Sequence, residues 1–137
     1  MPQDIIITLK KQHQELKGIL SGIKNKLNLD TPDSLDILAR LVNFKKKLNK
    51  HLALENDTFY PALLRKMKER NLEVGNTELF IGEMKTLELE IIDFLNKYNQ
   101  PKKIDSRLGR FKPELDFIIS SLMIRITSEE DGIYLYW

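Results

Sequence analysis

Four stretches of the chain repeat apolar residues at steps of three and four, and this pattern most constrains the fold. Such steps place the apolar residues of each stretch on one face of a helix. Four faces joined by short polar segments predict an all-α protein, an antiparallel up-down-up-down four-helix bundle in a single domain, residues 1–137. The expected seams are Ile6, Leu9, His13, Leu16, Leu20, Ile23 and Leu27; Ile37, Leu41, Phe44, Leu48, His51 and Glu55; Phe80, Met84, Leu87, Ile91, Phe94 and Tyr98; and Leu108, Phe111, Leu115, Ile118, Leu122, Arg125, Glu129 and Gly132 or Ile133.

Prolines mark several expected helix limits. Thr31 followed by Pro32 predicts the cap and the first turn of the second helix. Pro61 lies inside the pattern of that helix and predicts a bend near Tyr60 rather than an end. Pro113 either kinks the last helix or marks the start of its long part, and the sequence leaves both alternatives open.

Composition excludes several kinds of site. The chain has no cysteine, which excludes disulfides, thiolate metal sites and thiol nucleophiles. Its net charge is +2 and acids are interspersed among its lysines, so we expect no nucleic-acid partner. No apolar run approaches the length that crosses a membrane, and the first residues lack a signal-peptide pattern. The sequence predicts a cytoplasmic protein that binds no membrane.

Polar residues interrupt the seams at comparable depths in the expected bundle. His51 and Glu55 are four residues apart, so they lie one turn apart on the same face, in line with apolar neighbours. His13 interrupts the first seam, and Arg125 and Glu129 interrupt the last. Buried polar groups are costly unless they are paired, suitably protonated or bound to a metal. These positions therefore indicate a polar site inside the bundle.

The second and last seams share a short pattern, which carries a family resemblance. His51-x-x-x-Glu55-x-x-x-Phe59-Tyr60 is matched by Arg125-x-x-x-Glu129-x-x-x-Ile133-Tyr134. Together with Tyr60-Pro61 and with the first-helix run Gln12-His13-Gln14-Glu15-Leu16, this pairing resembles the hemerythrin-like family, the HHE cation-binding domain. The resemblance covers essentially the whole chain and implies a helical bundle around a two-iron site.

The resemblance also implies which residues hold metal. The family's histidines on the third and fourth helices would fall at Met84 and Arg125, so the nitrogen ligands of the second iron are missing. Glu88 on the third helix is an additional candidate ligand. The retained set suits one divalent ion, with iron favoured by the resemblance and manganese or zinc as alternatives. Its members are His13, His51, Glu55 and Glu129.

Arg125 supports a second, metal-free interpretation. Its guanidinium is expected near Glu55 and one turn from Glu129, where it would neutralise both carboxylates. The run Arg125-Ile-Thr-Ser-Glu129-Glu130 is also similar to the fourth helix of the Rsd/AlgQ anti-sigma regulators. That weaker resemblance implies a protein partner of the sigma-factor kind.

We therefore interpret the chain as a non-enzymatic hemerythrin-like protein with a partly lost di-iron site, acting as a metal-free regulatory or protein-interaction module. The alternative is a mononuclear metal-binding protein (Fe, Mn or Zn) that senses or binds oxygen-type ligands through the retained set. The sequence contains no H-E-x-x-H motif, no G-x-S-x-G motif and no phosphate-binding glycine loop. We therefore expect no enzymatic activity and no catalytic residue. The aromatic C-terminus, Ile133 to Trp137, is expected to cap the core or to contact a partner.

Overall fold

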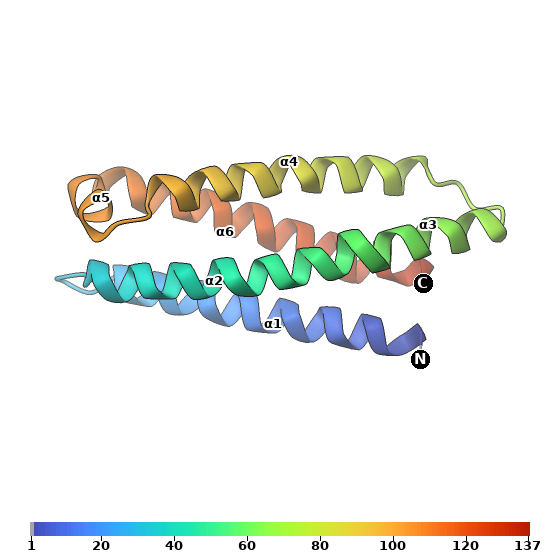
Figure 1. Ribbon diagram of the computed structural model, residues 1–137, viewed down its shortest axis with the longest axis horizontal. Coiled ribbons are helices and arrows are strands. Elements are labelled where there is room, and N and C mark those ends of the chain that lie inside the picture. Colours follow the sequence, from blue (N-terminus) through green and yellow to red (C-terminus); the bar gives the residue numbers. More distant parts are fainter. Residues whose placement is uncertain (1) are drawn as a thin grey trace.

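The computed structural model describes residues 2–137 and shows an antiparallel up-down-up-down bundle of four helical columns (Figure 1). Side chains are described from Ile5 onward. The first column begins, and the last column ends, at the same end of the bundle (Figure 1). The columns are α1 (Pro2–Leu27); α2 (Ser34–Leu54), the π-helical turn η1 (Glu55–Phe59) and α3 (Tyr60–Glu69); α4 (Gly75–Lys97); and α6 (Leu108–Asp131), with a short α5 (Pro101–Ser106) before α6 and a 3₁₀ turn η2 (Ile133–Tyr136) after it.

The predicted seams form the core, with one correction in the last helix. All members of the first three seams are buried except Ile6, which is half-buried near the start of α1. In α6 the inward position falls to Ile126, which is 2% exposed, and not to Arg125. The seam therefore steps by four and then three from Leu122 to Glu129, the reverse of the expected order. Arg125 is turned toward the bundle surface, where its guanidinium pairs with Glu83 at 3.1 Å.

The predicted bend near Tyr60 takes the form of a π-helical turn. Pro61 has no N–H to continue the α-helical hydrogen-bond ladder. The chain instead passes through one wide turn, in which the backbone N–H of Tyr60 donates to the carbonyl of Glu55. The extra residue shifts the register, so that the adjacent Phe59 and Tyr60 are both buried. Such turns are rare and are found frequently at functional sites.

Other limits differ from the predictions by a few residues. The second column begins at Ser34, because Asp33 and not Thr31 caps it; the Asp33 carboxylate accepts from the backbone N–H groups of Leu35 and Asp36. Helix α6 begins at Leu108 and has Pro113 in its interior, so the alternative in which Pro113 marks the start of the helix is wrong. The short helix α5 was not predicted. No helix of the described residues is long and apolar enough to cross a membrane.

Two apolar clusters fill the bundle, and the polar site lies between them. The larger cluster, called the loop-end cluster, extends to Leu27 and Ile37 on either side of the α1–α2 connection. It also contains Leu16 of α1 and Leu48 of α2. The terminal cluster lies nearer the chain ends, and its buried members are Leu9, Phe59, Tyr60, Leu63, Met67, Phe80 and Tyr134. His13 stands between Leu9 and Leu16 along α1, so it occupies the boundary between the clusters. This boundary layer is where the buried acids and imidazoles meet.

Candidate metal centre

Four side chains converge at the boundary between the two apolar clusters. Each offers a ligand atom, and these atoms all lie within 4.8 Å of one another. They come from α1, α2, the start of η1, and α6, so three of the four columns build the group. All are 3% exposed or less. The structure thus brings together the residues that the family resemblance implied, which are His13, His51, Glu55 and Glu129.

The outer nitrogen of each imidazole is held by an acceptor. The Nδ1 atom of His13 lies 2.6 Å from Oε2 of Glu130, and Nδ1 of His51 lies 2.7 Å from Oε1 of Gln12. A carboxylate oxygen and an amide oxygen only accept hydrogen bonds, so Nδ1–H is the donor in both rings. In the neutral ring this tautomer leaves the Nε2 lone pair pointing inward. Metal-binding histidines in proteins are oriented by outer hydrogen bonds of this kind.

Each inner nitrogen lies close to a carboxylate oxygen. Nε2 of His13 lies 3.3 Å from Oε1 of Glu129, and Nε2 of His51 lies 3.1 Å from Oε1 of Glu55. The two imidazole rings are close, with centroids 4.6 Å apart. A lone pair aimed at a carboxylate oxygen is unfavourable unless a proton or a cation lies between them. The centre is therefore arranged to hold positive charge.

Burial shifts the protonation of His51, Glu55 and Glu129 away from their charged forms. Burial lowers the pKa of His51 to about 4, so this imidazole is neutral near pH 7. Burial also raises the pKa of Glu55. Burial first, and then the hydrogen bond with Glu55, raise the pKa of Glu129 to about 8. In the metal-free protein near pH 7 the Glu129 carboxyl therefore retains its proton, and a divalent cation would replace it because metal ligands bind in deprotonated form.

Two tyrosines complete the centre, and the sequence analysis did not assign them to it. The Tyr60 hydroxyl donates to Oε2 of Glu129, and it also lies 3.4 Å from Oε2 of Glu55. The Tyr134 hydroxyl donates to Oε2 of Glu55 at 3.1 Å and lies 3.4 Å from Nε2 of His13. The signal for both was present in the repeated pattern, where each tyrosine follows a glutamate by five residues. The outer acceptors Gln12 and Glu130 were also missed, because adjacency to a ligand in sequence does not reveal a contact across the bundle.

The remaining predicted residues lie outside the four-residue group. Met84 is 3% exposed and packs in the loop-end cluster. Glu88 accepts a hydrogen bond from the Asn56 amide at 2.9 Å. The prediction that Arg125 neutralises Glu55 and Glu129 is wrong for the described chain, because its guanidinium pairs with Glu83 instead. Ile126 takes the inward position, so the guanidinium is directed away from the centre.

The donor set fits a divalent transition metal. Two imidazole nitrogens and two carboxylates suit iron, manganese or zinc, and the absence of thiolates disfavours softer ions. The outer hydrogen bonds on both imidazoles and both carboxylates provide the second layer that such sites need. Fold and site together define a class, a helical bundle with a buried two-histidine, two-carboxylate candidate centre.

Comparison with known families places the chain within that class. The model of the hemerythrin HHE cation binding domain matches residues 4–136. The chain therefore belongs to the hemerythrin HHE cation-binding domain family, as its motifs predicted. No curated protein and no solved structure matches it. The weaker resemblance to the Rsd/AlgQ regulators stays a prediction.

Proposed function

We propose that this protein binds one divalent metal ion, iron by its family, through His13, His51, Glu55 and Glu129. One observation carries the proposal. Both imidazoles are held by acceptors at Nδ1, so both Nε2 atoms face the centre together with the Oε1 atoms of the two glutamates. The side chain that the metal-free interpretation needs as a substitute cation, Arg125, pairs with Glu83. The mononuclear alternative is therefore the better supported of the two interpretations.

The chemistry that iron supplies in such a site is affinity for small oxygen-type ligands, which fits a sensor or carrier rather than an enzyme. The chain's own residues hold and orient the ion. Apolar clusters on both sides of the centre exclude water, which strengthens every electrostatic interaction inside it. We place the protein in the cytoplasm and expect a regulatory role without catalysis.

Elemental analysis of untagged protein tests this proposal. The protein is challenged with Fe(II) and with Zn(II) under anaerobic conditions, and unbound metal is then removed. We expect about one ion per chain, and little or none in His13→Ala and His51→Ala, because each variant loses an Nε2 ligand. Circular dichroism checks that both variants remain helical. No metal in the wild-type protein, or equal metal in folded variants, would contradict the proposal.

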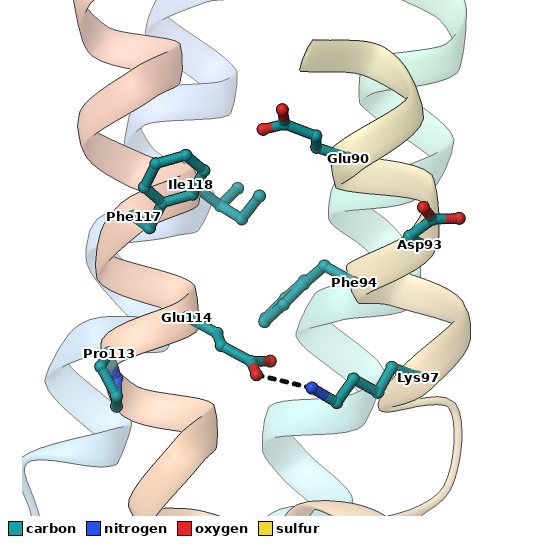
Figure 2. A pocket seen from close by; sticks show the side chains of 8 residues that line it. All are labelled: Glu90, Asp93, Phe94, Lys97, Pro113, Glu114, Phe117 and Ile118. Atoms are coloured by element: carbon teal, nitrogen blue, oxygen red, sulfur yellow. Dashed lines mark hydrogen bonds and ion pairs between the residues drawn. The ribbon is translucent and has the colours of Figure 1, made fainter. Parts of the chain in front are cut away.

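A groove between α4 and α6 favours a second candidate function, a protein-interaction module (Figure 2). The groove has a volume of about 570 Å³ and contains none of the four candidate ligands. Phe94 of α4 and Ile118 of α6 point into it, and Phe117, which is 56% exposed, stands on the α6 side (Figure 2). An ion pair of 2.6 Å between Lys97 and Glu114 bridges one end. Its lining residues are Glu90, Asp93, Phe94, Lys97, Pro113, Glu114, Phe117 and Ile118.

The groove continues along the bundle and is acidic on one side. A neighbouring cavity of about 270 Å³ shares Glu90 and extends to Glu83 and Arg125. Both cations along this path already have carboxylate partners, whereas Glu90 and Asp93 have no ion pair among the described residues. From Glu83 to Lys97 the groove follows about 20 Å of helix, or four turns. Apolar anchors beside uncompensated acids fit a basic amphipathic helix of a partner protein.

A synthetic four-turn helical peptide with a leucine stripe flanked by lysines tests this candidate. We expect the fluorescently labelled peptide to bind the wild-type protein with an affinity that falls as salt is raised. Phe117→Ser should weaken binding about tenfold or more, since buried aromatic anchors dominate such interfaces. Leu135→Ser is the matched control, because Leu135 is 76% exposed outside the groove. Equal peptide binding by all three proteins would overturn this candidate function. So would a wild-type dimer that Phe117→Ser abolishes, because the groove would then bind a second copy of the chain.

A further inference from the structure

The two glutamate–tyrosine pairs exchange hydrogen bonds across the centre. Each tyrosine follows its own glutamate by five residues, in the segments Glu55 to Tyr60 and Glu129 to Tyr134. The Tyr60 hydroxyl donates to Glu129, and the Tyr134 hydroxyl donates to Glu55. Each segment therefore supplies a carboxylate to the centre and a phenol to the other segment's carboxylate. This reciprocal arrangement joins two helical columns that are distant in sequence.

The exchange divides each carboxylate into two functional sides. The Oε1 atoms of Glu55 and Glu129 face the inner nitrogens of the histidines. The Oε2 atoms of the same residues face the tyrosine hydroxyls. One oxygen of each glutamate is thus directed to the metal position, and the other is already engaged by a donor from the protein.

The phenol rings are held firmly by their surroundings. Tyr60 is 3% and Tyr134 is 5% exposed. The Tyr134 ring is stacked on the His13 ring, with an interplanar angle of 5° and centroids 5.8 Å apart. Phe59 contacts both phenols, with centroids 5.5 Å from Tyr60 and 5.1 Å from Tyr134. Rings packed in this way present their hydroxyls at fixed points, which is what an orienting donor needs.

We propose that Tyr60 and Tyr134 are positioning residues that hold the Oε2 side of both carboxylates and thereby direct each Oε1 atom to the metal position. This inference rests on the proposed function, because it concerns the same four ligands. Each Oε2 accepts a buried phenol hydrogen bond, so Oε1 is the oxygen that each glutamate presents beside the inner histidine nitrogens. The tyrosines hold the glutamates and do not bind the ion themselves.

Removal of either hydroxyl should loosen the carboxylate that it holds. Tyr60→Phe leaves Oε2 of Glu129 without its phenol donor. Tyr134→Phe removes the shorter of the two phenol contacts of Glu55, whose Oε2 also lies 3.4 Å from the Tyr60 hydroxyl. Loss of such outer hydrogen bonds commonly lowers metal affinity about 10- to 100-fold. We expect an effect of this size in each single variant and a larger effect in the double variant. The ring remains in each case, so packing of the terminal cluster is retained.

Tyr98→Phe is the matched control. Tyr98 is 0% exposed and lies in the loop-end cluster, so this variant also removes one hydroxyl from a buried tyrosine, away from the centre. Affinity and stoichiometry for Zn(II) are measured by competition with a coloured chelator, and thermal unfolding of each metal-free protein is recorded. We expect Tyr98→Phe to bind like the wild-type protein. A purely structural role for the tyrosines would lower the melting temperature without changing the affinity.

Two results would overturn the inference, and they are distinguishable from failure of the proposed function. The first is wild-type affinity in folded Tyr60→Phe and Tyr134→Phe proteins that still bind one ion. The second is a visible phenolate-to-iron absorption in the Fe(III)-loaded wild-type protein, because the tyrosines would then be ligands. A wild-type protein that takes up no metal would instead remove the proposed function, and this inference with it.

Discussion

Two segments of the molecule carry the same pattern and differ in how they use it. In the segment from His51 to Tyr60 the helix continues through a π-helical turn, and His51 faces the centre. In the segment from Arg125 to Tyr134 helix α6 ends at Asp131, and a 3₁₀ turn carries the tyrosine inward. Different backbone conformations therefore bring the two glutamates and the two tyrosines to equivalent places.

The difference between the segments lies at their first residue. His51 is buried, whereas the Arg125 guanidinium is directed to Glu83 at the edge of the bundle. The second nitrogen of the centre comes instead from His13 of α1. The glutamate–tyrosine exchange is therefore symmetric, but the nitrogen ligands are not. A centre with nitrogen ligands on one side only is suited to a single ion.

The largest expected difference is in metal affinity, between substitutions at the first residues of the two segments, His51 and Arg125. His51→Ala should abolish metal binding, because it removes a ligand. Arg125→Ala should leave affinity within a few-fold of wild type, because its side chain contacts Glu83 and Phe80 rather than the four ligands. Isothermal titration with Zn(II) checks both. A comparable loss in the two variants would show that Arg125 contributes to the centre after all.

The residues before the two tyrosines should differ in their effect on stability. Phe59 is fully buried and contacts both tyrosine rings, so Phe59→Ala should lower the free energy of unfolding by about 3–5 kcal/mol. Its counterpart Ile133 is only partly buried, and Ile133→Ala should cost roughly half as much or less. Urea unfolding of the metal-free proteins measures both. Equal costs would show that the terminal cluster depends on both segments alike.

The stability of the metal-free protein should depend on pH through Glu129. Folding raises the pKa of this carboxyl from 4.5 to about 8, so its contribution is fully present below pH 4.5 and is lost as the pH rises toward 8. His51 acts oppositely, because its lowered pKa of about 4 makes the protein lose stability as the pH falls from 6.5 toward 4.

Glu129→Gln should therefore flatten the decline in stability between about pH 5 and pH 8, because glutamine does not ionise. Urea unfolding across this range measures the change. The control is Glu83→Gln, since Glu83 is half exposed and pairs with Arg125 at the surface. An unchanged slope in Glu129→Gln would show that another group dominates the alkaline side.

The smallest expected difference is in the free energy of unfolding, between substitutions at Thr58 and Gly132, which each lie three residues after a glutamate of the centre. A Cβ atom at Gly132 would approach the carbonyl oxygen of Ser128 to 2.9 Å, which forces the backbone before Tyr134 to move. Gly132→Ala should cost about 1–2 kcal/mol, within the usual range for single substitutions. Thr58 is exposed, so Thr58→Ala should stay within about 0.5 kcal/mol. Thermal unfolding compares them, and the reverse order would contradict the close approach.

The sequence was sufficient for the bundle and for the four converging side chains. Periodic apolar residues specify which face of each helix is buried, and the family motifs indicate which polar residues join that face. The sequence did not predict the orientation of Arg125. An apolar seam can step by three and then four residues or by four and then three, and only packing shows that Ile126 faces inward. The sequence also missed the tyrosine exchange. That contact depends on a π-helical turn in one segment and a 3₁₀ turn in the other, and neither follows from helical periodicity.

X-ray absorption at the iron edge of anaerobically loaded protein tests whether one ion lies between two imidazoles and two carboxylates, with no second ion beside it. We predict scattering from nitrogen and oxygen neighbours, an outer-shell signature of two imidazoles, and no iron neighbour. The imidazole signature should be reduced in any iron retained by His13→Ala. An iron neighbour, or wild-type iron without imidazole scattering, would show that the centre is not a single ion held by these four side chains.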